Sequence, residues 1–290
     1  MTSTVSAENT DSSPAETGHT RVNGVNYYHE IHGSGEPVLL LHGGLGSIDM
    51  FAPVLPVFAK ARTVIAVDLQ GHGRSSLGDR PIRVQDMADD MAGILDQLDY
   101  DTVDVVGYSL GGGVALHLAT RHPERVRRLV IISTGYSQDG FHPEMLPQQA
   151  QVSGAIAGMM KDTPMYKSYI AVAPRPQDFP ELLDRLGDFM RTPFDFEEDV
   201  KKIQAQTLLV FGDADMFRLE HVVQFYKLLG GAQQDAGFMR EHMARNRLAI
   251  LPDVTHYETF MSPSMVAVVL PFINGVSNAP SWAHQVDAKQ

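Results

Sequence analysis

The pentapeptide at residues 107–111, Gly-Tyr-Ser-Leu-Gly, places a serine between two glycines, after the apolar run 103–106 and before the helix-like run 113–119. A serine on a sharp strand-to-helix turn presents its hydroxyl, and small flanking residues let neighbouring backbone approach. The unpaired N–H groups of the helix start, including that of Leu110, can stabilise an oxyanion. We therefore predict that Ser109 attacks a carbonyl carbon and forms a covalent acyl-enzyme.

A serine hydroxyl is a weak nucleophile at neutral pH, so a histidine must take its proton and a carboxylate must orient that histidine. Among twelve histidines, His256 is favoured because it lies between a predicted strand, 247–251, and a helix starting near Pro263. His42 and His72 lie in glycine turns, where hydrogen bonding to the loop is the expected duty. His256 is therefore the predicted base.

Two aspartates follow the predicted strand 207–211, at the edge of the sheet where the serine is expected. We favour Asp215 as the acid that orients the histidine. Asp213 is nearer the strand end and could instead hydrogen-bond backbone in the turn, a common duty of aspartate beside glycine. Only geometry can separate the two carboxylates.

A glycine-rich loop, residues 42–47, follows the predicted strand 38–41 and reaches the same edge. Its lack of bulky side chains would let a backbone N–H, that of Gly44 or alternatively of Leu45, serve as the second oxyanion donor. A dinucleotide-binding loop would need a third glycine where Asp49 stands. We therefore predict an oxyanion hole and no cofactor.

Short apolar runs alternate with stretches of helical spacing such as residues 84–98. The runs lie at residues 38–41, 64–67, 103–106, 129–132 and 208–211. This alternation predicts an α/β fold, with a parallel sheet covered by helices and ligands bound beyond the carboxyl ends of the strands.

The alternation lapses over residues 134–200, where seven prolines divide the chain into short pieces. We predict an inserted helical lid whose apolar side chains wrap the substrate, although packing within the lid is an equal alternative for each of them. The candidate substrate-binding residues are Met145, Met159, Met160 and Phe189. The predicted organisation is a disordered tail (1–20), a first core part (21–133), the lid (134–200), a second core part (201–275) and a tail (276–290).

The chain has 290 residues and a net charge of −12, which disfavours nucleic acid and anionic lipid as partners. A small, neutral or apolar substrate fits better. Cysteine is absent, which excludes thiol catalysis and Cys-ligated zinc, and no His-Glu-x-x-His metal motif occurs. With no secretory signal pattern and no apolar run of about 20 residues, we expect a cytoplasmic protein without a membrane span.

The blocks at residues 42–46, 68–75, 107–111 and 212–215, followed by His256, resemble those of the α/β-hydrolase family. The resemblance covers about residues 22–273 and includes the order serine, aspartate, histidine. It implies a mostly parallel eight-stranded sheet flanked by helices, with an inserted helical lid. It also implies that Asp215 is the acid and that Gly44 and Leu110 line the oxyanion hole. The residues of block 68–75 indicate no chemical role by themselves.

A serine in the nucleophile position implies acyl transfer, whereas an aspartate there would suggest dehalogenase or epoxide hydrolase chemistry. We therefore expect a carboxylic ester hydrolase acting on small to medium apolar substrates. Two alternatives stay open: a lactonase or carbon-carbon bond hydrolase with the same triad, and a non-catalytic ligand receptor.

Overall fold

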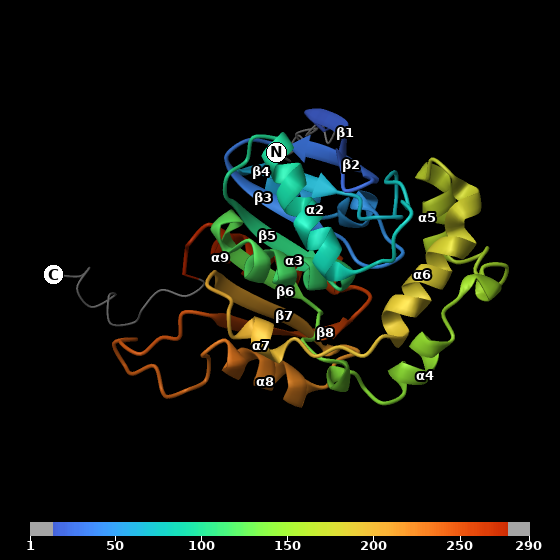
Figure 1. The fold of residues 1–290 in the computed structure, drawn as a ribbon. Helices are drawn as coiled ribbons and strands as arrows, with labels where there is room; N and C mark the ends of the chain where they lie inside the picture. Colours follow the sequence, from blue (N-terminus) through green and yellow to red (C-terminus); the bar gives the residue numbers. More distant parts are fainter. Residues whose placement is uncertain (1–13, 278–290) are drawn as a thin grey trace, which may run out of the picture.

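The computed structural model describes residues 14–277, which form one eight-stranded sheet (Figure 1). The strands are β1 (Glu16–Val22), β2 (Val25–His32), β3 (Glu36–Leu41), β4 (Arg62–Val67), β5 (Val103–Tyr108), β6 (Val126–Ile132), β7 (Gln206–Ala214) and β8 (Arg247–Thr255). Their order is β1-β2-β4-β3-β5-β6-β7-β8. Strand β2 is antiparallel to both neighbours, and all other adjacent pairs are parallel. The predicted fold class is confirmed.

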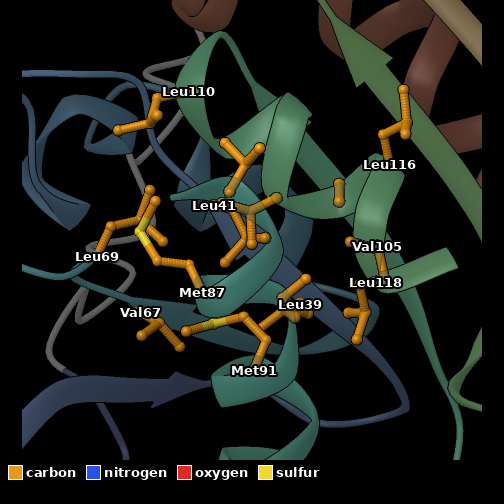
Figure 2. Close-up of a cluster of buried hydrophobic side chains, with 14 of the residues drawn as sticks. Leu39, Leu41, Val67, Leu69, Met87, Met91, Val105, Leu110, Leu116 and Leu118 are labelled. Carbon is orange, nitrogen blue, oxygen red and sulfur yellow. The ribbon is translucent and has the colours of Figure 1, made fainter. Parts of the chain in front are cut away.

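Both faces of the sheet are buried. Successive residues of a strand point to opposite faces, so Leu39 and Leu41 join one apolar cluster while Val38 and Leu40 join the other. Helices α2 (Val84–Gln97), α3 (Leu110–Arg121) and α8 (Leu219–Leu228) cover the first face, and α1 (Leu55–Ala59) and α9 (Pro263–Ile273) cover the second. Figure 2 shows Met87 of α2 among the β3 leucines.

The segment between β6 and β7 carries four α-helices among its described residues. They are α4 (Met145–Ala150), α5 (Pro164–Val172), α6 (Phe179–Arg191) and α7 (Glu197–Val200). Figure 1 shows α4, α5 and α6 gathered on one side of the molecule. Short 3-10 helices complete the chain: η1 (Ile48–Phe51), η2 (Pro123–Arg125), η3 (Gln138–Gly140), η4 (Gly154–Ile156), η5 (Pro176–Asp178) and η6 (Thr259–Met261). None of the helices in the described ranges has the length and apolar character needed to cross a bilayer.

The two ends of this helical insertion are joined to each other. The Gln138 N–H donates to the Phe194 carbonyl at 3.0 Å, and the Phe196 N–H donates to the Tyr136 carbonyl at 2.8 Å. The first end is also joined to the loop after β7, because the His142 N–H donates to the Met216 carbonyl at 3.0 Å. The insertion therefore leaves and re-enters the core at one point.

The amino-terminal boundary of the core was predicted too late. Strand β1 begins at Glu16, inside the predicted tail 1–20, and pairs with β2 from Glu16 opposite Ile31 onward. A turn at Asn23 and Gly24, both with positive φ, closes this hairpin. Residues 1–13 and 278–290, which make up most of the two predicted tails, lie outside the described residues.

Candidate active site

Ser109 occupies a strained backbone conformation between β5 and α3, with φ 51° and ψ −116°. Its N–H donates to the Ile132 carbonyl of β6 at 2.9 Å, which fixes the turn against the neighbouring strand. A Cβ on Gly107 would lie 2.3 Å from the Gly111 carbonyl oxygen, and one on Gly111 would lie 2.5 Å from the Leu41 carbonyl oxygen. Glycine is therefore required on both sides of the strained serine.

Ser109, His256 and Asp215 meet in one hydrogen-bonded chain. His256 Nε2 lies 3.1 Å from Ser109 Oγ, and His256 Nδ1 lies 3.0 Å from Asp215 Oδ1. His256 and Asp215 are buried, whereas Ser109 is partly exposed. The geometry can pass a proton from the hydroxyl to the imidazole while the carboxylate faces the other ring nitrogen.

Asp215 has two further donors that sequence reasoning missed. Ser133 Oγ donates to Asp215 Oδ2 at 2.5 Å, and the Met216 N–H donates to Asp215 Oδ1 at 2.8 Å. Ser133 is buried and has a left-handed φ of 50°. It follows β6 directly, as Asp215 follows β7, so the pairing of these strands brings them together. Asp213 is instead exposed and accepts the Val254 N–H at 3.4 Å.

Tyr108, the residue before the serine, supports the histidine. Its hydroxyl donates to the His256 carbonyl at 2.8 Å, and its ring packs against the imidazole with 5.4 Å between centroids. Burial raises the pKa of Tyr108, so the hydroxyl keeps the proton that it donates. The pentapeptide therefore holds both the serine and the loop that carries His256.

The glycine-rich loop passes beside Ser109. A Cβ on Gly43 would lie 3.3 Å from the Ser109 Cβ, and the Gly111 N–H donates to the His42 carbonyl at 3.0 Å. Within the described part of the chain, no hydrogen bond engages the backbone N–H of Gly44 or of Leu110. Both predicted donors are therefore available, and a Cβ on Gly44 would meet nothing within 4 Å.

A small cavity of about 160 Å³ lies against the triad. It is lined by His142, Glu144, Met145, Ala214, Asp215, Met216, His256 and Tyr257. A larger groove of about 780 Å³, between residues 79–86 and 185–196, is lined by none of the three triad residues. Of these two hollows, the small cavity is the one that touches the triad, at Asp215 and His256, and Ser109 lines neither.

The four candidate substrate-binding residues of the insertion lie in different places. Met145 lines the small cavity beside His256, and Phe189 lines the larger groove. Met160 packs against the core, whereas Met159 is 77% exposed and lines neither hollow. Only Met145 is therefore placed beside the triad.

Two histidines outside the triad are buried in the loops beside it. His42 Nε2 accepts the Leu69 N–H at 2.9 Å, and its Nδ1 lies 2.7 Å from the Gly43 carbonyl. Burial lowers the pKa of His42 to about 4 and that of His72 to about 3, so both rings are neutral at pH 7. Among residues 14–277, no group of three or more His, Asp or Glu is placed to hold a metal ion.

Comparisons with known proteins agree with this architecture. The family model for the alpha/beta hydrolase fold matches residues 36–162. The solved enol-lactonase of Burkholderia xenovorans LB400 superposes with a TM-score of 0.66 at 19% identity, covering 89% of this chain and all of the other. At that identity the likeness shows the fold alone.

Two curated relatives are similar in sequence. The 2-hydroxymuconate semialdehyde hydrolase of Pseudomonas sp. CF600 is 44% identical over 109 residues, 35% of this chain and 38% of the relative. The carboxylesterase YbfK of Bacillus subtilis is 30% identical over 188 residues, 61% of this chain and 63% of the relative. The chain thus spans less than two thirds of either relative.

Proposed function

We propose that this chain, which belongs to the α/β-hydrolase fold family, hydrolyses carboxylic esters of small to medium apolar substrates through an acyl-enzyme on Ser109. Hydrolase activity is common to the relatives, and the ester is our specific proposal. The observation that carries it is the hydrogen-bonded chain from Ser109 through His256 to Asp215. We also propose that the enzyme works in the cytoplasm without a cofactor or metal.

In the proposed acylation, Ser109 Oγ forms a bond to the carbonyl carbon while His256 Nε2 takes the hydroxyl proton. Asp215 stabilises the imidazolium, and the N–H groups of Gly44 and Leu110 hold the oxyanion. When the carbon–oxygen bond breaks, His256 returns the proton to the leaving alcohol. Water then attacks the acyl-enzyme with the same proton transfers and releases the carboxylic acid and free Ser109.

The small cavity supports a compact group on the His256 side of the scissile bond. About 160 Å³ is well below the volume of a drug-sized site, and the cavity wall includes the imidazole that protonates the leaving group. We therefore propose that it receives the leaving alcohol. The helical insertion, whose Met145 lines this cavity, is proposed to act as the lid.

A second candidate is hydrolysis of a carbonyl compound that is not an ester. The relative with 44% identity is named for a semialdehyde substrate, and the same triad could attack a ketone carbon. Its matched segment covers only 38% of that protein, which is why the ester remains our first proposal.

The test is release of p-nitrophenol from acyl esters of two to twelve carbons, by the native chain and by Ser109→Ala. We expect turnover that Ser109→Ala abolishes, together with labelling of Ser109 by a fluorophosphonate. Turnover that survives Ser109→Ala would overturn the mechanism. Labelling without ester turnover would favour the second candidate, and neither labelling nor turnover would favour a ligand receptor.

A further inference from the structure

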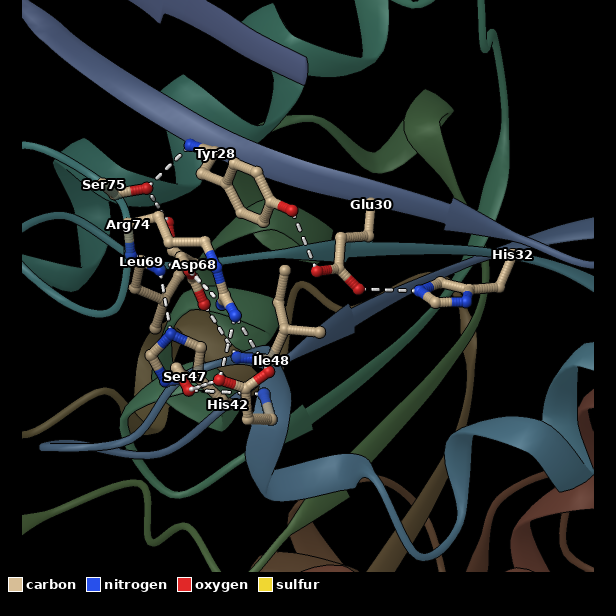
Figure 3. A network of polar contacts seen from close by, with 11 residues as sticks. Tyr28, Glu30, His32, His42, Ser47, Ile48, Asp68, Leu69, Arg74 and Ser75 are labelled. Carbon is tan, nitrogen blue, oxygen red and sulfur yellow. Dashed lines mark hydrogen bonds and ion pairs between the residues drawn. The ribbon is translucent and has the colours of Figure 1, made fainter. Parts of the chain in front are cut away.

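The block at residues 68–75 contributes nothing to the proposed chemistry, yet Asp68, Leu69 and Arg74 make hydrogen bonds to the glycine loop and the two residues that follow it (Figure 3). We propose that Asp68 and Arg74 are positioning residues that clamp this loop where the Gly44 N–H meets the oxyanion. The inference rests on the proposed function. It adds a reason for the block that the triad alone does not supply.

Asp68 connects the end of β4 to the start of η1. It follows β4, and its Oδ1 accepts the N–H of Ile48, the first residue of η1 beyond the glycine loop, at 2.7 Å. Its Oδ2 accepts the Arg74 N–H at 2.8 Å and the Arg74 guanidinium at 3.3 Å. Asp68 is fully buried, so these bonds are shielded from water.

The guanidinium of Arg74 reaches the far side of the loop. Its Nη2 lies 3.1 Å from both carboxylate oxygens of Asp49, whose own N–H donates to Ser47 Oγ at 3.3 Å. The guanidinium also lies over the Tyr28 ring, 5.0 Å from its centroid. The end of the loop is therefore held by both side chains of the clamp.

The beginning of the loop is tied to the same block. The Leu69 N–H donates to His42 Nε2 at 2.9 Å, and His42 Nδ1 contacts the Gly43 carbonyl at 2.7 Å. Between Gly43 and Ser47 the described hydrogen bonds are few, with the Gly46 N–H donating to the Gly43 carbonyl at 3.2 Å. Gly44 therefore lies in a short span whose two ends are fixed by residues 68–74.

Stability alone is a poor reason for a carboxylate at position 68. Burial raises the pKa of Asp68 to about 6, although the hydrogen bonds from Arg74 and Ile48 act to lower it. With the folded pKa above the ordinary value, the folded chain loses stability as pH rises from about 4 to about 6, and the full cost of the charge is present at pH 7. A charge kept at that cost is consistent with a positioning role.

The opposite end of the sheet offers a matched control. Asp104 at the start of β5 is also fully buried and pairs with Arg127, whose side chain is 32% exposed and also pairs with Glu36. Arg74, 24% exposed, likewise joins buried Asp68 to an exposed acid. Because Asp104 begins the strand that Ser109 follows, its pairs lie away from the glycine loop.

The experiment measures the second-order rate of Ser109 labelling by an alkyl fluorophosphonate, together with Tm, in Asp68→Asn, Arg74→Gln, Asp104→Asn and Arg127→Gln. The phosphonyl oxygen occupies the oxyanion position, so no knowledge of the substrate is needed. We expect Asp68→Asn to label about 10- to 100-fold more slowly, since a misplacement of about 1 Å can cost 10²-fold. Arg74→Gln should slow labelling about 3- to 10-fold, a smaller share of that same loss, because the Ile48 bond remains.

The controls should show the reverse pattern. Asp104→Asn leaves the charge of Arg62, which is 3% exposed, without the buried negative charge that balances it, so Tm should fall at least as far as in Asp68→Asn while labelling stays within about threefold of native. On any ester that is hydrolysed, Asp68→Asn should lower kcat and leave KM nearly unchanged, because neither Asp68 nor Arg74 lines the cavity that touches the triad.

Every outcome either supports or overturns the clamp. If Asp68→Asn and Arg74→Gln label as fast as the controls, or if all four variants slow equally, the clamp is wrong while the proposed function stands. If Asp68→Asn does not fold, the comparison of Arg74→Gln with Arg127→Gln decides: slower labelling of Arg74→Gln alone supports the clamp, and equal labelling rates overturn it. If the native chain is not labelled at all, the proposed function fails and the clamp fails with it.

Discussion

Replacing Asp215 by asparagine should preserve the geometry of the triad and remove only its charge. Asp215 Oδ1 accepts both the Met216 N–H and His256 Nδ1, while Oδ2 faces Ser133 Oγ. An amide placed here must direct its oxygen to the backbone donor, which leaves that oxygen facing the imidazole. Its NH₂ then meets the Ser133 hydroxyl, which can turn to accept. The histidine therefore keeps its proton on Nδ1.

The size of the loss follows from the charge. With His256 Nδ1 3.0 Å from the carboxylate oxygen, the imidazolium of the transition state loses an attraction on the order of 4 kcal/mol. That corresponds to about 10³-fold in kcat. Asp215→Ala also loses the group that fixes the tautomer, and removal of the aspartate of a triad costs on the order of 10⁴-fold in kcat. Asparagine should therefore retain roughly tenfold more activity than alanine, a gap of about 1.4 kcal/mol.

The assay is kcat on one p-nitrophenyl ester for Asp215→Asn, Asp215→Ala and the control Asp213→Asn, each with Tm. Asp213 is exposed and bonded to the Val254 N–H, so its variant should stay within about threefold of native, as an exposed site away from the triad should. A kcat of Asp215→Asn equal to or lower than that of Asp215→Ala would show that the amide presents its NH₂ to His256, which would refute the hydrogen-bond reasoning. A larger loss in Asp213→Asn would refute the choice of acid.

Ser133→Ala removes the donor to Asp215 Oδ2, and a hydrogen bond to a charged group contributes about 1.5–3 kcal/mol to stability. Because only the part of this energy that is larger in the transition state affects turnover, we expect kcat to fall by up to about tenfold with KM unchanged. An unaltered kcat would contradict this role. Met145→Trp should fill the small cavity and raise KM for esters of bulky alcohols more than for methyl esters. Equal changes in KM would show that the alcohol portion does not bind in that cavity. His117 is buried, and its Nε2 has no partner in the part of the chain described here. Burial lowers the pKa of His117 from 6.5 to about 4, so between these pH values the unfolded chain binds a proton that the folded chain does not, and stability is lost as pH falls from 6.5 toward 4. His117→Leu should therefore raise the free energy of unfolding by about 1 kcal/mol at pH 7 and flatten the fall of Tm between pH 6.5 and 4; an unchanged slope would exclude this histidine as its source.

The parts of the fold that could be predicted are those with strong local signals. Strands buried on both faces, such as β3 and β5, are short and mostly apolar, and the glycines around Ser109 mark a turn that few other residues tolerate. Strand β1 has mostly exposed or half-exposed residues, and its sequence therefore resembles a polar tail. Its pairing with β2 gives it order that no property of residues 16–22 predicts.

The rest of the site depends on neighbours in space. Ser133 carries no local mark of its role, because it meets Asp215 only through the pairing of β6 with β7. The choice between Asp213 and Asp215 likewise depends on which carboxylate faces His256. The apolar residues of the insertion show the same limit. Met145 and Met159 are the same residue type in similar proline-divided segments, yet Met145 lines the small cavity and Met159 is exposed to solvent.

The two ends of the helical insertion meet beside the active site. The chain leaves and re-enters the core where residues 136–138 are hydrogen-bonded to residues 194–196. Beyond this point the outgoing segment is hydrogen-bonded through the His142 N–H to the carbonyl of Met216, the residue after Asp215. Residues 143–193 also bury Phe179, Leu182 and Leu183 in the core, and Arg185 donates to the carbonyls of Leu77, Gly78 and Arg80. A change within this segment is therefore felt by the body of the protein as well as by the wall of the small cavity.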